Sequence, residues 1–343
     1  MAAARILSEV CVAETREVAL DENDRPIAVR LTRLTEERPQ QIGERFTGKL
    51  RSISPTQGGG FVQLDKQAGD VFLRLQDSQG LTEGQTLEVR VVAEPREGSK
   101  LARVVLADRT SDVRNLDPWG TAKVERVDPG NAIVAHAFDM VLTPTVPLAG
   151  GGTLTIDRTR ALIAADIDTA GRTDAGRAAN RALKANLDAA GELARQIRLR
   201  NLGGLIVLDC VGPINRDAGK QVRERFLAVF RQISDQQVRA LAPSELGLME
   251  ASIEWAETPI AERLLGHSGG KASRAVCFDG FRRLEQEARA RPMERLCLDL
   301  PGHAHAWLES NGAPLRLAIA AKYGERFTYD STNPPTPSVY SIQ

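Results

Sequence analysis

Three aspartates stand where two apolar segments of the sequence end. Asp166 and Asp168 close a segment that begins at Gly150, and Asp209 closes a second one that begins at Gly203. Apolar runs bounded by glycine are typical of buried strands, and neighbouring strands would hold these carboxylates together at the rim of a sheet. Hard cations such as Mg²⁺ take one or two protein carboxylates and complete their shell with water and substrate phosphate. The pattern therefore indicates metal-dependent chemistry at phosphorus on a polyanion.

A basic segment joins the two predicted strands. Between Arg172 and Arg200 it carries seven arginines and lysines against three acidic residues, although the whole chain has a formal net charge of zero. Apolar residues recur at helical spacing and predict one buried face: Leu183, Leu187, Ala190, Ala194 and Ile197. We therefore expect the basic groups on the other faces of this helix, where phosphates can reach them.

A long match to a known family covers this helix and the strand after it. The run NLDAA at 186–190, followed by ELARQIRLRNLGGLIVLD at 192–209, resembles the catalytic core of the ribonuclease E/G family. The resemblance implies a DNase I-like α/β domain in which Asp166 and Asp209 hold a catalytic Mg²⁺, with Mn²⁺ as an alternative ion. Asp168 would take the place of a third polar residue, often Asn, in the metal site. Isolated aspartates more commonly form turns or cap helices, and for Asp168 both interpretations stand.

Residues 44–108 predict short strands separated by turns, the rhythm of a five-stranded barrel of the oligonucleotide-binding (OB) type. This segment resembles the S1 domain that the same family carries at this place. The resemblance implies that Phe61 and Phe72 stack on RNA bases and that Lys100 contacts RNA. Stacking on an exposed ring demands no particular base sequence. Core packing inside the barrel is the alternative for both rings, and an ordinary solvated charge is the alternative for Lys100.

The segments around the barrel are predicted from alternation and turn residues. Residues 1–43 predict an N-terminal β-hairpin that packs on the core. Residues 109–149 predict a shortened connector with one helix at 132–142. Full-length relatives have an RNase H-like subdomain here and a pocket that senses the RNA 5′-monophosphate, so we expect this chain to lack both. The catalytic domain is expected over 150–264, with an amphipathic helix at 217–234.

The C-terminal part predicts a small domain behind a linker. Residues 265–274 are rich in glycine and predict a linker where many relatives have a Cys-Pro-x-Cys zinc link. His267 and Cys277 supply only two of the four ligands that a structural zinc needs, so we do not expect zinc. The sequence is compatible with a homo-oligomer, although not with one joined by such a link. Residues 275–343 predict a small α/β domain.

The general properties of the chain exclude several classes of protein. Its 343 residues are enough for several domains with a buried core. The four cysteines, Cys11, Cys210, Cys277 and Cys297, lie far apart without a CxxC pair, which suits a reducing compartment. The start of the chain lacks a secretory signal, and no segment reaches the length of a membrane span. We therefore expect a soluble cytoplasmic protein of the α/β multidomain class, with no membrane partner.

The resemblance predicts a Mg²⁺-dependent endoribonuclease that cuts single-stranded RNA and leaves a 5′-phosphate and a 3′-hydroxyl. Arg172, Arg177 and Lys184 are the candidates to hold the RNA backbone, although a solvated helix face explains each of them equally well. Two departures from the family pattern support a second hypothesis. Arg160 stands where many relatives have an acid, and Ile253–Trp255 stand where many have basic residues. The second hypothesis is a non-catalytic RNA-binding protein, for example a ribosome-associated module that recognises RNA shape.

Overall fold

The chain forms two compact units, which are described separately. The computed structural model describes residues 3–35, 40–65, 69–74, 80–96, 100–107, 122–266 and 268–342. Apart from Met1, the first unit contains residues 38–118 and 144–258, and the second contains residues 2–37, 119–143 and 259–343. His267, residue 108 at the end of the predicted barrel segment and residues 109–121 of the predicted connector lie outside the described residues, so what was predicted for them stays a prediction.

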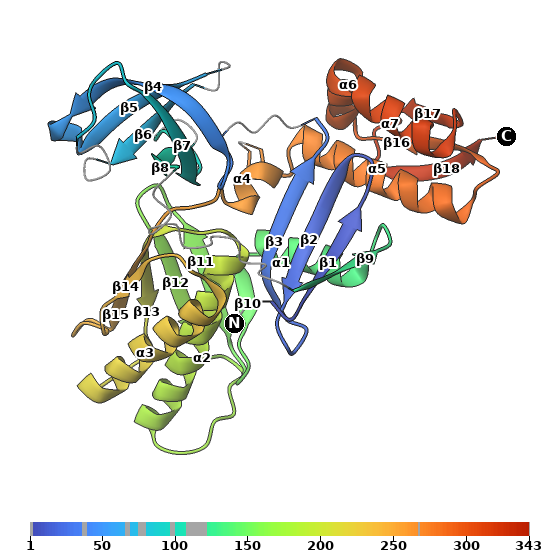
Figure 1. Ribbon diagram of the computed structural model, residues 1–343. Coiled ribbons are helices and arrows are strands. Elements are labelled where there is room, and N and C mark those ends of the chain that lie inside the picture. Colours follow the sequence, from blue (N-terminus) through green and yellow to red (C-terminus); the bar gives the residue numbers. More distant parts are fainter. Residues whose placement is uncertain are drawn as a thin grey trace. The chain divides into compact units, whose positions relative to one another are not determined.

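The first unit begins with a closed barrel of five strands in the order β4-β5-β6-β8-β7 (Figure 1). The strands are β4 (Arg45–Ser54), β5 (Gly59–Leu64), β6 (Asp70–Arg74), β7 (Thr86–Ala93) and β8 (Arg103–Leu106). Successive side chains of a strand point to opposite faces, and the inward ones fill the barrel. Among them Val62, Val71 and Leu73 are fully buried. The five-stranded barrel predicted within residues 44–108 is therefore confirmed.

The rest of the first unit is a six-stranded sheet in the order β10-β11-β12-β13-β15-β14. Its strands are β10 (Thr145–Pro147), β11 (Thr153–Arg158), β12 (Ile163–Asp168), β13 (Gly204–Asp209), β14 (Val238–Ala240) and β15 (Leu248–Ile253). Neighbouring strands are antiparallel except for the parallel pair of β12 and β13. The helices α2 (Ala178–Leu199) and α3 (Arg216–Ile233) cover one face, and their apolar sides share one core with the strands. The other face carries the exposed residues of the strands.

The structure corrects the strand predicted from Gly150 to Asp168. It consists of two antiparallel strands, β11 and β12, which pair with each other. Thr159 makes the turn between them: its hydroxyl oxygen accepts hydrogen bonds from the backbone N–H groups of Ala161 and Leu162 at 3.3 and 3.1 Å. Threonine hydroxyls stabilise turns through such local bonds. The apolar character of the two strands hid this short polar turn in the sequence.

The helix predicted from Arg172 to Arg200 begins later than its charge pattern indicated. Helix α2 starts at Ala178, so Arg172 lies in a loop and Arg177 is the residue that caps the helix. Gly171 and Gly176 have φ angles of 78° and 111°, in the left-handed region that favours glycine. Two such residues keep the intervening backbone out of the helical conformation. The helix predicted at 217–234 is confirmed as α3.

The second unit contains a four-stranded sheet in the order β3-β2-β1-β9. Its strands are β1 (Arg5–Val10), β2 (Glu14–Leu20), β3 (Pro26–Arg33) and β9 (Lys123–Val127). The predicted N-terminal hairpin is present as β2 and β3, but β1 adds a third antiparallel strand and β9 pairs with β1 in parallel. Helix α1 (Ala132–Leu142) follows β9 and confirms the helix predicted there.

A three-stranded sheet, in the order β17-β16-β18, completes the second unit with the C-terminal helices. The elements are α4 (Ile260–Leu264), α5 (Ser273–Ala290), β16 (Arg295–Asp299), α6 (Gly302–Asn311), α7 (Ala313–Tyr323), β17 (Phe327–Asp330) and β18 (Ser338–Ile342). The predicted linker contains a turn closed by the bridge between Leu265 and Lys271. Within the described part of the chain, no helix combines the length and the apolar character needed to cross a bilayer.

Buried ion pairs connect helix α5 to the N-terminal sheet inside this unit. The Glu14 carboxylate is fully buried and contacts the guanidinium groups of Arg16 at 2.8 Å and Arg33 at 3.1 Å. It also accepts a hydrogen bond from Arg282 of α5. A buried carboxylate is tolerated only where such partners compensate for its lost hydration.

Candidate functional site

Asp166 and Asp209 lie side by side on the parallel strands in the middle of the sheet of the first unit. The register pairs Ala165 with Leu208, so Asp166 and Asp209 are the next neighbours along β12 and β13. Ala165 and Leu208 point into the core, and both aspartates are therefore exposed on the face opposite the helices. Two neighbouring exposed carboxylates form the donor set that Mg²⁺ takes from a protein when water and phosphate complete its shell. The residues present thus fit the predicted ion.

Asp168 is placed differently from the other two aspartates. It is exposed at the end of β12, and its Oδ1 atom accepts a hydrogen bond from the backbone N–H group of Ala170 at 2.8 Å. This contact is the turn-forming interaction that the sequence allowed as an alternative. Within the described ranges, no three His, Cys, Asp or Glu side chains are grouped closely enough to hold a metal ion together. A part for Asp168 in a metal site stays a prediction.

A cleft of about 290 Å³ opens beyond the ends of β12 and β13. It is bordered by the loop after β12, by the first turns of α2 and by the loop after β13, through Thr169, Arg172, Asp174, Ala178, Arg181, Ala182, Val211 and Gly212. None of the three aspartates is among these residues, although Thr169 and Val211 follow β12 and β13 closely in the sequence. Two of its lining residues are arginines, which can attract an anionic chain.

The Arg172 guanidinium is occupied by protein partners. Its side chain is only 7% exposed and donates to the carboxylates of Asp174 and Asp188 at 2.8 and 2.9 Å, and to the Gly151 carbonyl at 3.0 Å. Burial alone would lower the pKa of Arg172, but hydrogen bonds and charge from Asp188 and Asp174 outweigh burial and raise it. Arg172 thus holds the loop at the cleft, and a contact with RNA would require these bonds to break.

Arg177 and Lys184 remain exposed at the start of α2. Arg177 precedes the first helical residue, and its side chain is exposed. The Lys184 side chain is 58% exposed, with its Nζ atom 3.7 Å from an oxygen of Asp174. A weak exposed pair of this kind leaves the ammonium group accessible. Both positions are therefore compatible with the predicted contact with an RNA backbone.

The basic residues in the second half of α2 do not face solvent, which corrects the expectation from the sequence. Arg195 pairs with Glu192, and the side chain of Arg200 donates to Gln196 at 2.8 Å. Burial lowers the pKa of Arg200 to about 10. Arg198 is 6% exposed. These side chains stabilise the end of the helix instead of forming an anion-binding face.

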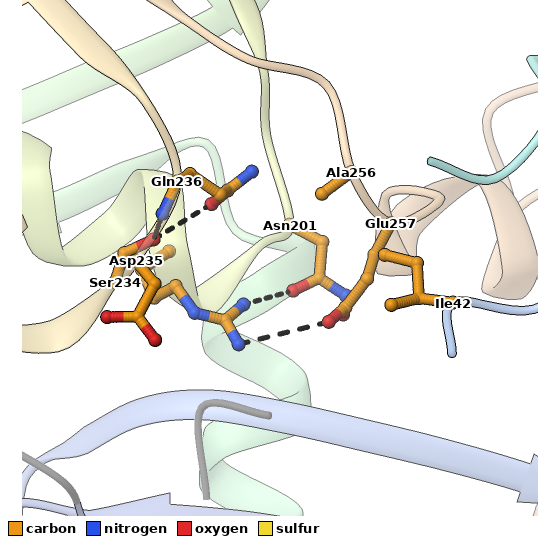
Figure 2. A pocket seen from close by; sticks show the side chains of 8 residues that line it. Ile42, Asn201, Ser234, Asp235, Gln236, Ala256 and Glu257 are labelled. Carbon is orange, nitrogen blue, oxygen red and sulfur yellow. Dashed lines mark hydrogen bonds and ion pairs between the residues drawn. The ribbon is translucent and has the colours of Figure 1, made fainter. Parts of the chain in front are cut away.

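Figure 2 shows Asn201 and Glu257 at a pocket. The pocket has a volume of only about 20 Å³ and is also lined by Arg198. The Arg198 guanidinium donates to Asn201 at 2.9 Å and lies 4.0 Å from a carboxylate oxygen of Glu257. The volume is close to that of a single water molecule. The pocket is therefore a small gap in a structural contact and not a ligand site.

The rings of Phe61 and Phe72 lie on the outer face of the barrel. The two residues are cross-strand partners on β5 and β6, and their ring centroids are 5.7 Å apart in an edge-to-face arrangement. Both side chains are half-buried, and neither belongs to the barrel core. Gly59 leaves room for the Phe72 ring, because a Cβ atom there would lie 2.4 Å from it. The rings are thus placed where bases can reach them. Lys100 is exposed, and its backbone bridges to that of Arg96.

Two arginines beside these rings were missed in the sequence. Arg74 follows Phe72 by two residues on β6 and therefore points to the same outer face. Arg103 on β8 is the register partner of Phe72. The alternation along β6 could have identified Arg74, whereas Arg103 requires knowledge of the strand order. Phe61, Phe72, Arg74 and Arg103 together are called the platform below.

The fold and site define an α/β protein that combines a small barrel, with two half-buried rings on its outer face, and a sheet with paired carboxylates. Residues 122–254, which include Asp166 and Asp209, match the Ribonuclease E/G family. This segment is similar to that family. The barrel strands lie outside the matched residues.

Curated relatives match parts of the chain. Ribonuclease E of Escherichia coli K12 is 37% identical over 132 residues, which are 38% of this chain and 12% of that protein. Ribonuclease G of the same strain is 28% identical over 215 residues, 58% of this chain and 42% of that protein. A chloroplastic ribonuclease E/G-like protein of Arabidopsis thaliana is 33% identical over 172 residues, which are 48% of this chain and 16% of that protein. The chain thus spans less than half the length of each of these relatives.

Among solved structures, a multidomain protein with nucleic acid binding domains from Streptococcus pneumoniae is 17% identical, with a TM-score of 0.18. The alignment covers 31% of this chain and 39% of that one. A likeness this small bears on neither fold nor function.

Proposed function

We propose that this protein is a Mg²⁺-dependent endoribonuclease of DNase I-like type that cuts single-stranded RNA in RNA processing or decay. The observation that carries the proposal is the position of Asp166 beside Asp209 within the segment that matches the family. The products would be a 5′-phosphate and a 3′-hydroxyl. The buried, widely spaced thiols of Cys11, Cys210, Cys277 and Cys297 suit a reducing compartment, so we assign the protein to the cytoplasm.

In this proposal Asp166 and Asp209 hold the metal, with Mn²⁺ as a substitute ion. A bound divalent ion supplies a Lewis acid for the scissile phosphate and lowers the pKa of a coordinated water. Arg177, Arg181 and Lys184 line or flank the cleft and attract the sugar-phosphate backbone. Arg172 keeps the loop after β12 in place through its bonds to Asp174 and Asp188.

The barrel would act as an S1-type RNA-binding domain. The half-buried rings of Phe61 and Phe72 on the outer face offer stacking surfaces that any base can use, and Arg74, Arg103 and Lys100 supply positive charge around them. Such a surface prefers single strands, because bases in a duplex are already stacked. This preference supports an unpaired RNA as the substrate class.

The test is Mg²⁺-dependent cleavage of a labelled single-stranded RNA by Asp166→Asn and Asp209→Asn variants. Each substitution removes a hard anionic ligand but keeps the side-chain size, so cleavage should be lost while RNA affinity stays nearly unchanged. Asp157→Asn is the matched control, since Asp157 is exposed on the neighbouring strand β11 and its substitution removes the same charge. Full activity of either site variant at limiting Mg²⁺ would overturn the assignment.

The second candidate is a non-catalytic RNA-binding protein. It is favoured by two departures from what the family resemblance leads us to expect: Glu254 is an acid at a position expected to be basic, and Arg160 is an exposed base, in the turn before β12, at a position expected to be acidic. This candidate predicts RNA binding without cleavage by the wild-type chain at any Mg²⁺ or Mn²⁺ concentration. A preference for structured over single-stranded RNA in the same binding assay would support the ribosome-associated form.

A further inference from the structure

One carboxylate of the sheet reaches the platform of the barrel. The Oε1 atom of Glu254, the residue after β15, accepts hydrogen bonds from Arg74 and from Arg103, both at 2.6 Å. The side chains are partly exposed, at 28% for Glu254, 42% for Arg74 and 21% for Arg103. A single acidic oxygen thus bridges two guanidinium groups at a site that water can reach.

The barrel is attached to the sheet by other contacts besides the Glu254 carboxylate. The Trp255 indole donates to the Glu94 carbonyl at 3.0 Å, and the Glu94 N–H group donates to the Ala256 carbonyl at 2.8 Å. The Arg96 guanidinium also lies 4.0 Å from the centre of the Trp255 ring. These contacts join the residues after β15 to the segment after β7 without the Glu254 side chain, so the barrel has attachments to the sheet that do not depend on the Glu254 bridge to β6 and β8.

The chemistry of the bridge is that of phosphate recognition. Paired arginines bind the oxygens of carboxylates and phosphates in the same way, through charge-assisted hydrogen bonds. Arg74 and Arg103 flank Phe72, where a base stacked on the ring would bring its own phosphate close to them. One carboxylate also leaves the pair of arginines with a net positive charge.

We propose that Arg74 and Arg103 form a phosphate site of the platform and that Glu254 occupies it until RNA displaces the carboxylate. This inference rests on RNA being the ligand of the proposed function. Glu254 then acts as an internal competitor, which lowers the affinity for every RNA. RNA strands that place a phosphate beside a stacked base therefore bind more tightly than polyanions that offer negative charge alone.

The experiment measures binding of a fluorescent single-stranded RNA by anisotropy, with EDTA present so that no cleavage occurs. Glu254→Gln removes the competing charge and should tighten binding by up to about fivefold for each of the two exposed charge pairs that it breaks. In a plot of the logarithm of the association constant against the logarithm of the salt concentration, the negative slope for Glu254→Gln should be steeper than that of wild type by roughly 0.7 for each additional phosphate that is neutralised. Glu88→Gln is the control, because Glu88 is exposed on strand β7 of the same barrel and its substitution removes the same charge.

The arginines decide between a specific site and a general charge effect. In an Arg74→Gln/Arg103→Gln background, Glu254→Gln should give no gain, and the double arginine variant alone should bind RNA more weakly than wild type. Unchanged or weaker binding by Glu254→Gln, or an equal gain in Glu88→Gln, would overturn the inference. If Glu254→Gln lowers the melting temperature, its RNA affinity no longer decides the question. In that case the inference is overturned if the Arg74→Gln/Arg103→Gln variant binds RNA as tightly as wild type. Binding without cleavage in Mg²⁺ refutes only the proposed enzyme, whereas absence of RNA binding in every variant refutes both.

Discussion

Replacement of Phe72 by alanine separates the two roles that its ring could have. The ring is half-buried on the outer face and touches Phe61 edge-to-face at 5.7 Å between centroids. Losing such a pair costs about 0.5–1.5 kcal/mol beyond the buried area, far less than the roughly 3–5 kcal/mol for a fully buried phenylalanine. Stacking of one base contributes about 1–3 kcal/mol. We therefore expect RNA to bind about 5- to 150-fold more weakly, with a small loss of stability.

Both quantities are measured on the same variants, by RNA anisotropy and by chemical denaturation. Leu73→Ala is the matched control, because Leu73 is the next residue on β6 and is fully buried in the barrel core. It should lower the free energy of unfolding by roughly 2–5 kcal/mol and leave the RNA affinity of the folded protein nearly unchanged. The reasoning fails if Phe72→Ala behaves like Leu73→Ala, with a large loss of stability and an unaltered dissociation constant.

Two further predictions concern the second unit and the RNA end. Glu14→Gln should lower the free energy of unfolding by about 3–5 kcal/mol, because it breaks a fully buried ion pair. Glu17→Gln, on the same strand but in a partly exposed pair with Arg30, should cost less than about 1 kcal/mol; equal losses would contradict the role of the buried network. Cleavage should be indifferent to the 5′ end, since residues 109–149 are too few for a sensing subdomain. RNAs with a 5′-hydroxyl, monophosphate or triphosphate, compared below saturation, test this. A monophosphate preference of about tenfold, or 1.4 kcal/mol, would reveal a sensor.

The meeting of Asp166 and Asp209 could be predicted because each lies at or near the end of an apolar strand in a segment that resembles a known family. Strand register follows from the buried alternation of Ala165 and Leu208 with exposed neighbours. The turn at Thr159 could not be predicted in the same way, because apolar residues flank it on both sides. Local periodicity identifies buried strands well, but it does not fix where a short polar turn divides them.

The roles of the charged residues were harder to predict than the strands. Arg198 and Arg200 belong to a basic segment of the sequence, yet both are buried against partners. A count of charges cannot distinguish a basic face from a set of internal ion pairs, because the partners of a long side chain depend on tertiary contacts. The same reason hid the bridge from Glu254 to Arg74 and Arg103, which joins residues more than a hundred positions apart in the sequence.

The platform and the carboxylate pair share one unit but no residue, so binding and cleavage should respond to different substitutions. Interactions at Phe72 are the same before and during the reaction, and such uniform binding affects KM without changing kcat. Phe72→Ala should therefore recover full kcat at saturating RNA. Loss of Asp209 removes an interaction needed at the reacting phosphate, and no RNA concentration should restore the rate. Equal losses of kcat in both variants would instead mean that the barrel positions the scissile bond directly.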